Sequence, residues 1–69
     1  MSKYNALWDY IAARSEPAFT LTFDEIHVIA GIEIDHSFLN YKKELLTFGY
    51  QVGKISLKAQ TVEFLKLES

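Results

Sequence analysis

The chain has 69 residues, of which 49% are hydrophobic and 14% aromatic, and it carries a net charge of −2 with no cysteine. These values are typical of one small domain that folds around an apolar core, and they exclude disulfides and a thiolate metal site. No uncharged run approaches the roughly 18 residues that a membrane-spanning helix needs, and no apolar segment follows Lys3, so we expect a single cytoplasmic domain over residues 1–69 with neither membrane anchor nor signal peptide.

The charge is unevenly distributed along the chain. Residues 1–35 hold two basic and six acidic side chains, a net −4, whereas residues 36–69 hold five lysines against three glutamates, a net +2. Such asymmetry can mark a surface for a polyanion, although in a chain this short it also arises without any function.

The first expected element is a helix from about Ser2 to Arg14. Its apolar residues recur at the positions i, i+3, i+4 and i+7 that form one face of a helix: Tyr4, Leu7, Trp8 and Ile11. Pro17 separates this helix from the next element, because a proline cannot continue a helix. The alternating, β-prone residues 19–22 then predict a short strand at the edge of a sheet.

The best-marked element is the helix Phe23–Ala30, because the residues at both of its ends favour helix termini. Thr22 is a good N-cap, and Glu25 can complete a capping box by accepting the backbone N–H of Thr22. Gly31 can adopt the left-handed conformation that ends a helix.

A third helix is expected to begin at Asp35 or Ser37 and to run to Phe48. At about 100° per residue, one apolar stripe of this helix contains four residues. They are Phe38, Tyr41, Leu45 and Phe48. Leu39 and Leu46 form a second apolar edge.

The last two elements are expected to form a β-hairpin with strands at residues 50–57 and 62–67 and a four-residue loop between them. This loop length sets two core-facing pairs: Leu57 with Val62, and Ile55 with Phe64.

The opposite face of the hairpin then carries an apolar group that a second chain or the first helix must cover. Its members are Val52, Leu65 and Leu67. A bulge at Gly53 is the alternative, and it would shift Val52 to the core face.

The order of these elements is helix–short strand–helix–helix–β-hairpin, which is the order of a winged helix. In that fold three helices pack into a core, the first strand can join the hairpin, and the third helix is the recognition helix. The sequence therefore predicts an α+β, winged-helix-like domain.

Three segments carry a resemblance to known sequences. They are residues 21–31, which begin with LTFDEI, residues 34–39 (IDHSFL), and residues 49–64, which contain GYQV, KISL and TVEF. They resemble a family of small, uncharacterised bacterial proteins that read roughly as LTF-x-EI, an apolar turn leading to Ser, and G-[YW]-x-V…L…TV-x-F. Longer relatives carry an Arg- and Trp-rich insertion between the Ser and the hairpin, which this chain lacks. The resemblance supports the fold and implies no activity.

No constellation in the sequence predicts catalysis. Asp35, His36 and Ser37 are consecutive, and consecutive residues at a helix start do not face one another, which argues against a catalytic triad. His27 and His36 have no further ligand at helical spacing, so we expect no metal site. The glycines are isolated, which excludes a phosphate-binding loop. We therefore expect a non-enzyme without catalytic residues, cofactor or small-molecule substrate.

Two binding functions remain open. The first is binding of duplex DNA through polar side chains of the third helix and the hairpin: His36, Asn40, Lys43, Thr47, Lys54 and Lys58. Against it stand Glu44 on the same helix face and an acidic balance unlike that of most DNA-binding modules. The second is protein interaction or homodimerisation through apolar residues: Leu39, Leu46, Val52, Leu65 and Leu67.

Overall fold

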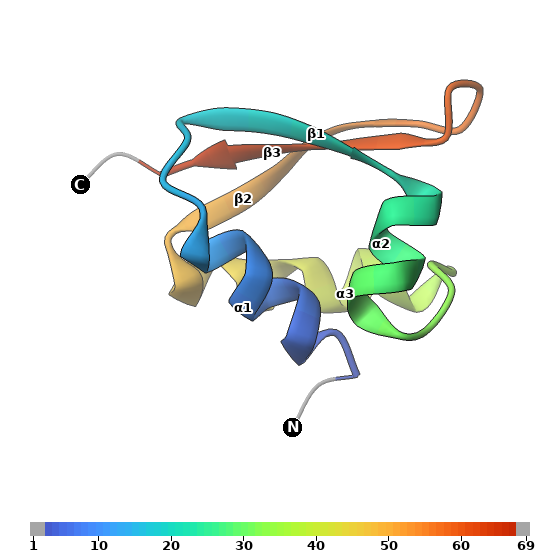
Figure 1. Ribbon diagram of the computed structural model, residues 1–69, viewed down its shortest axis with the longest axis horizontal. Coiled ribbons are helices and arrows are strands. Elements are labelled where there is room, and N and C mark those ends of the chain that lie inside the picture. Colours follow the sequence, from blue (N-terminus) through green and yellow to red (C-terminus); the bar gives the residue numbers. More distant parts are fainter. Residues whose placement is uncertain (1–2, 68–69) are drawn as a thin grey trace.

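A layer of helices packs against one face of a three-stranded antiparallel sheet in the computed structural model, which describes residues 3–67 (Figure 1). The elements in chain order are α1 (Asn5–Ala13), β1 (Ala18–Thr22), α2 (Phe23–Ala30), α3 (Ser37–Tyr41), the 3-10 helix η1 (Lys42–Phe48), β2 (Tyr50–Ser56) and β3 (Thr61–Lys66). The strand order is β1-β3-β2, so the first strand lies at an edge beside the last. The predicted α+β class and element order are confirmed. Ser2, the expected start of the first helix, lies outside the described residues.

The capped helix α2 forms as its sequence predicts. The Thr22 hydroxyl accepts the Glu25 backbone N–H at 3.0 Å, and the Glu25 carboxylate accepts the Thr22 backbone N–H at 2.8 Å. Gly31 ends the helix with a φ of +76°, and its N–H donates to the His27 carbonyl. Because φ is positive here, a side chain at this position would strain the backbone.

The third helix differs from the single α-helix that we expected. It is α-helical for one turn and then tightens into η1. At its end the Gly49 N–H donates to the carbonyls of Leu45 and Leu46, and the Thr47 hydroxyl donates to the Glu44 carbonyl three positions back. A period of three residues places Lys42, Leu45 and Phe48 on one side. Leu45 is buried, Phe48 packs against the core, and Lys42 is half-buried, as is Glu44.

The expected outward position of Glu44 is wrong. Its carboxylate accepts the indole N–H of Trp8 at 3.1 Å, which joins η1 to α1. Trp8 is fully buried, so the bond satisfies a donor that has left water. The sequence periodicity of a regular helix does not predict this contact, because Glu44 lies in a segment wound as a 3-10 helix and its partner is 36 positions away in the sequence.

The predicted hairpin register is also wrong. Ser56 pairs with Thr61 and Ile55 with Val62, so the loop is Leu57–Gln60, one residue earlier than expected. The register shifts between Val52 and Ile55, and Val52 then pairs with Phe64. This irregularity at Gly53 is the bulge considered as the alternative. Val52 and Ile55 both pack against the core, whereas Leu57 does not.

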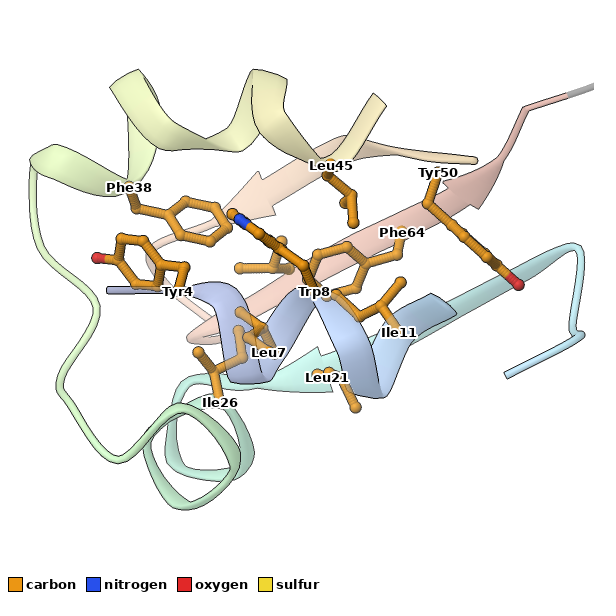
Figure 2. Packing of buried hydrophobic residues seen from close by; sticks show 11 residues of the cluster. Tyr4, Leu7, Trp8, Ile11, Leu21, Ile26, Phe38, Leu45, Tyr50 and Phe64 are labelled. Carbon is orange, nitrogen blue, oxygen red and sulfur yellow. The ribbon is translucent and has the colours of Figure 1, made fainter. Parts of the chain in front are cut away.

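The core lies between the sheet and the helices (Figure 2). Its centre is aromatic: the ring of Tyr4 lies 5.4 Å from that of Phe38 and 5.7 Å from that of Trp8. Aliphatic side chains of α1, α2 and the sheet surround these rings. Within residues 3–67, no helix has the length and apolar composition that a bilayer crossing requires.

Tyr50 anchors the segment between α1 and β1. Its ring is buried, and its hydroxyl lies 2.7 Å from the carbonyl oxygens of both Arg14 and Glu16, which share its one proton. The Arg14 guanidinium stands 4.1 Å above the centre of the Phe19 ring and pairs with the Glu16 carboxylate, which raises the pKa of Arg14 further above its ordinary value. These contacts fix the direction in which the chain enters the sheet.

Candidate functional site

An open groove of about 480 Å³ lies between the start of α2, the segment that leads into α3, and the loop end of β2. Its walls are mostly apolar and come from three separate parts of the chain: Phe23, Ile34, Phe38, Leu39, Ile55 and Leu57. Asp35 and His36 are the polar residues that line it. A volume of this size falls within the range of roughly 300–1,000 Å³ that binding sites occupy.

The β2–β3 loop positions Leu57 at this groove. The loop lies at the same end of the sheet as α2 (Figure 1), and the Phe23 N–H donates to the Gln60 carbonyl at 2.8 Å. Gln60 adopts a φ of +56°, a left-handed conformation that closes the loop. Leu57 precedes this closure and is 79% exposed. It is therefore the most exposed apolar side chain that lines the groove.

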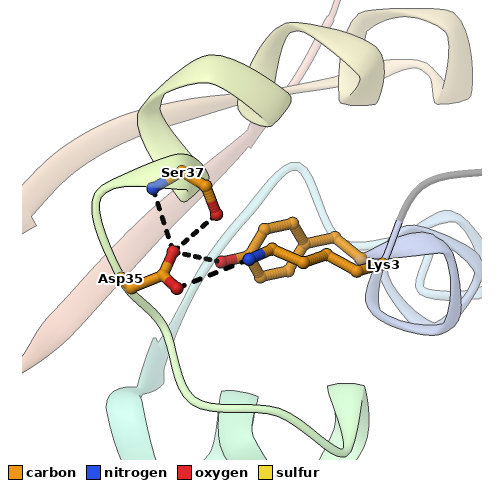
Figure 3. A network of polar contacts seen from close by, with 4 residues as sticks. Lys3, Asp35 and Ser37 are labelled. Carbon is orange, nitrogen blue, oxygen red and sulfur yellow. Dashed lines mark hydrogen bonds and ion pairs between the residues drawn. The ribbon is translucent and has the colours of Figure 1, made fainter.

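Asp35 holds the entry to α3 through several polar contacts (Figure 3). Its carboxylate accepts the backbone N–H of Ser37 at 2.9 Å and the Ser37 hydroxyl at 2.5 Å. The Tyr4 hydroxyl donates to the same carboxylate at 3.4 Å, and the Lys3 ammonium pairs with it at 3.4 Å. The two bonds from Ser37 are the main reason that the pKa of Asp35 falls from 3.8 to about 2, with Lys3 adding a smaller effect. Asp35 is consequently ionised throughout the physiological pH range.

The residues proposed for nucleic acid are exposed but do not share one face. His36 lines the groove, and Asn40 belongs to α3, whereas Lys43 and Thr47 belong to η1. In a 3-10 helix, residues four positions apart point about 120° away from each other, instead of the about 40° of an α-helix. The change of winding therefore separates Lys43 from Thr47.

The remaining two nucleic-acid candidates lie on the hairpin. Lys54 is part of the irregular stretch of β2, where its backbone N–H donates to the Glu63 carboxylate. Lys58 lies in the loop directly after Leu57. Both side chains are exposed, so they remain accessible to a charged partner.

The structure distributes the predicted interface residues over different surfaces. Leu39 is 53% exposed and lines the groove, and Leu46 is 48% exposed on η1. Val52 packs against the core, contrary to the first prediction for its face. Leu65 and Leu67 are half-buried. Of the five, only Leu39 belongs to the groove.

Sequence reasoning missed most of the groove. Phe23 was predicted only as the first residue of a helix, and Leu57 was expected to face the core. Gly53 signals the bulge that moves Val52 to the core face, but the bulge lies on the far side of Ile55 from the loop, so it does not account for the exposure of Leu57.

Comparison with known proteins adds no relative: no family model, no curated protein and no solved structure matches the chain. Among residues 3–67, histidine and carboxylate side chains form no cluster that could hold a metal ion. The groove and the exposed side chains around it are therefore the features from which a function can be inferred.

Proposed function

We propose that this protein is a small winged-helix-like interaction module, not an enzyme, and that it binds a polypeptide through the groove. The winged-helix assignment is supported by the strand order β1-β3-β2 and by the direct passage from η1 into β2. In this assignment the Leu57–Gln60 loop is the wing and the segment from Ser37 to Phe48 takes the place of the recognition helix.

The observation that carries the proposal is the exposure of Leu57 beside an apolar groove. Full burial of a leucine side chain stabilises a fold by about 1.5–3 kcal/mol. An exposed leucine in a small domain does not provide this stabilisation. Leu39 is also more than half exposed at the same groove. Apolar side chains grouped around a concave surface usually mark an interface, and the side chains of a partner polypeptide fit such a site.

Site-directed photo-crosslinking in cells that produce the protein tests this proposal. A photoreactive phenylalanine analogue placed at Leu57 should form discrete covalent adducts with protein. The matched control is Val28 in α2, which is 83% exposed and lies by a different hollow. Equal adduct patterns at the two positions, or none at Leu57, would refute binding through the groove.

A second candidate function is binding of duplex DNA. It is favoured by the exposure of all six predicted polar residues, which lie on the third-helix segment and the hairpin. Titration of a fluorescent duplex at low salt tests it. Affinity should fall steeply with salt, with a slope of about −2 if the two wing lysines neutralise phosphates. Lys58→Glu should weaken binding more than Lys66→Glu, which changes an exposed lysine at the other end of the hairpin. No binding at tens of micromolar protein would end this hypothesis for the isolated domain.

A further inference from the structure

The groove and the wing of this protein complement each other in apolar character and charge, and from this we propose that the polypeptide bound in the groove is the wing of a second copy. The inference rests on the proposed function and names its partner. In the resulting symmetric dimer, Leu57 of each copy enters the groove of the other. A two-fold arrangement of this kind is the commonest form of homo-oligomer, because one surface serves both partners.

Leu57 is placed where it can reach a second copy of the chain. It lines the groove and at the same time protrudes from it, with 79% of its surface exposed. A two-fold axis that passes near Leu57 therefore brings each wing to the other copy's groove without any rearrangement of the chain. The walls that receive the leucine are apolar, chiefly the half-buried Phe23, Ile34 and Ile55.

The wing and the segment on the opposite side of the groove carry opposite charges. The wing and the end of β2, residues 54–60, carry Lys54 and Lys58 and no acidic residue, a net charge of +2. The acidic wall opposite, residues 31–36, lines the groove with Ile34, Asp35 and His36. It carries Asp35 and, just before the lining residues, Glu33, and no lysine or arginine, a net charge of −2. When Leu57 of one copy enters the groove of the other, Lys58 comes next to this acidic wall. Asp35 carries its charge at neutral pH, since even the ordinary pKa of 3.8 lies far below it.

The carboxylates of the acidic wall remain accessible to a partner even though Asp35 also makes contacts within the chain. The Asp35 side chain is 55% exposed, and its ion pair with Lys3 is long, at 3.4 Å. Glu33 is also exposed. An incoming Lys58 thus meets the Asp35 carboxylate at the groove, with the exposed Glu33 two positions before it in the chain, while the Phe23–Gln60 hydrogen bond ties the loop of the same copy to α2.

Sedimentation equilibrium on the purified protein tests the dimer. Between about 10 µM and about 1 mM, the average mass should rise from the 7.9 kDa of one chain toward twice that value. Leu57→Lys should weaken association at least about a hundredfold, because both copies lose a buried leucine. Val28→Lys, which adds the same charge to an exposed apolar position of α2, should leave it unchanged. Lys58→Glu should weaken association by about two- to tenfold, and added salt should reduce that difference.

The absence of cysteine allows a second measurement that identifies the contact. Leu57→Cys supplies the only thiol in the chain, close to the proposed axis, and mild oxidation should convert it into a covalent dimer. Val28→Cys is the matched control and should oxidise to a dimer much more slowly. Because both positions are exposed, neither substitution should prevent folding, which the far-ultraviolet circular dichroism of each variant will verify.

The outcomes separate this inference from the proposed function. A chain that stays monomeric at the highest concentration, or a dimer that Leu57→Lys does not dissociate, overturns the inference. If cellular crosslinking at Leu57 still yields adducts with another protein, the groove is an interface for that protein and the proposed function stands. If both experiments are negative, both proposals fail.

Discussion

Removing the Glu44 carboxylate tests the most specific long-range contact of the fold. The indole N–H of Trp8 donates to Glu44 at 3.1 Å; Trp8 is fully buried and Glu44 half-buried, so the substitution removes the acceptor of a buried donor. A buried donor left without a partner costs about 1–3 kcal/mol. We therefore expect Glu44→Ala to lower the free energy of unfolding by that amount. A domain of this size has about 3–10 kcal/mol in total, so the loss is substantial.

A graded series distinguishes the hydrogen bond from other effects of substitution. Glu44→Gln keeps an acceptor oxygen but loses the charge, and it should cost about 1 kcal/mol, because a bond to a charged group exceeds a neutral one by about that much. Lys43→Ala changes an exposed neighbour in the same 3-10 helix and should stay within about 0.5 kcal/mol of the unmodified protein.

Urea unfolding followed by fluorescence is the assay, since Trp8 is the only tryptophan. The midpoint should fall in the order Lys43→Ala, Glu44→Gln, Glu44→Ala, with an unchanged slope if the folded state keeps its compactness. In thermal unfolding, each kcal/mol corresponds to about 4–8 °C. If Glu44→Ala unfolds at the same urea concentration as Lys43→Ala, the bond between α1 and η1 contributes nothing to the free energy of unfolding, which would refute the reasoning.

Three further predictions use the same assay. Thr22→Ala should cost about 1 kcal/mol, because it removes the hydroxyl that caps α2; an unchanged midpoint would show that the capping box is not needed. Tyr50→Phe should also cost about 1 kcal/mol, since it removes the hydroxyl shared by two carbonyl groups and leaves the ring in place; a loss below about 0.3 kcal/mol would mean that water replaces it. Asp35→Asn tests the pH dependence of stability. Because the pKa of Asp35 is lowered in the folded state, its charge stabilises the fold fully above pH 3.8, and this contribution is lost as the pH falls to about 2. The unmodified protein should therefore lose its advantage in stability over Asp35→Asn across that interval. A constant difference would contradict the assigned role of the charge.

Local chemistry made part of this fold predictable. The helix α2 begins and ends where its sequence indicates, because Thr22, Glu25 and Gly31 act on backbone groups within a few residues of themselves. The edge strand β1 also follows from its own alternating residues and the proline before it.

Contacts between distant parts of the chain account for what could not be predicted. Glu44 turns toward Trp8, which is 36 positions away in sequence, and no periodicity along η1 contains that information. The hairpin register depends on whether Val52 or Leu57 gains more from the core, and the chain alone leaves that competition undecided. The groove is even harder to predict from the sequence, because it is formed by three segments that come together only in the folded chain.

The exposed surface at the groove results from the register of the hairpin, not from a surplus of apolar residues. The bulge at Gly53 brings Val52 opposite Phe64, and the closing pair of the hairpin leaves Leu57 in the loop. The monomer thus forgoes the about 1.5–3 kcal/mol that burial of a leucine provides. If a second copy buries it, folding and association become linked, and the melting temperature should rise with protein concentration. Leu57→Lys should abolish that dependence while Val28→Lys keeps it. A melting temperature that is independent of concentration in the unmodified protein would show that Leu57 remains in water.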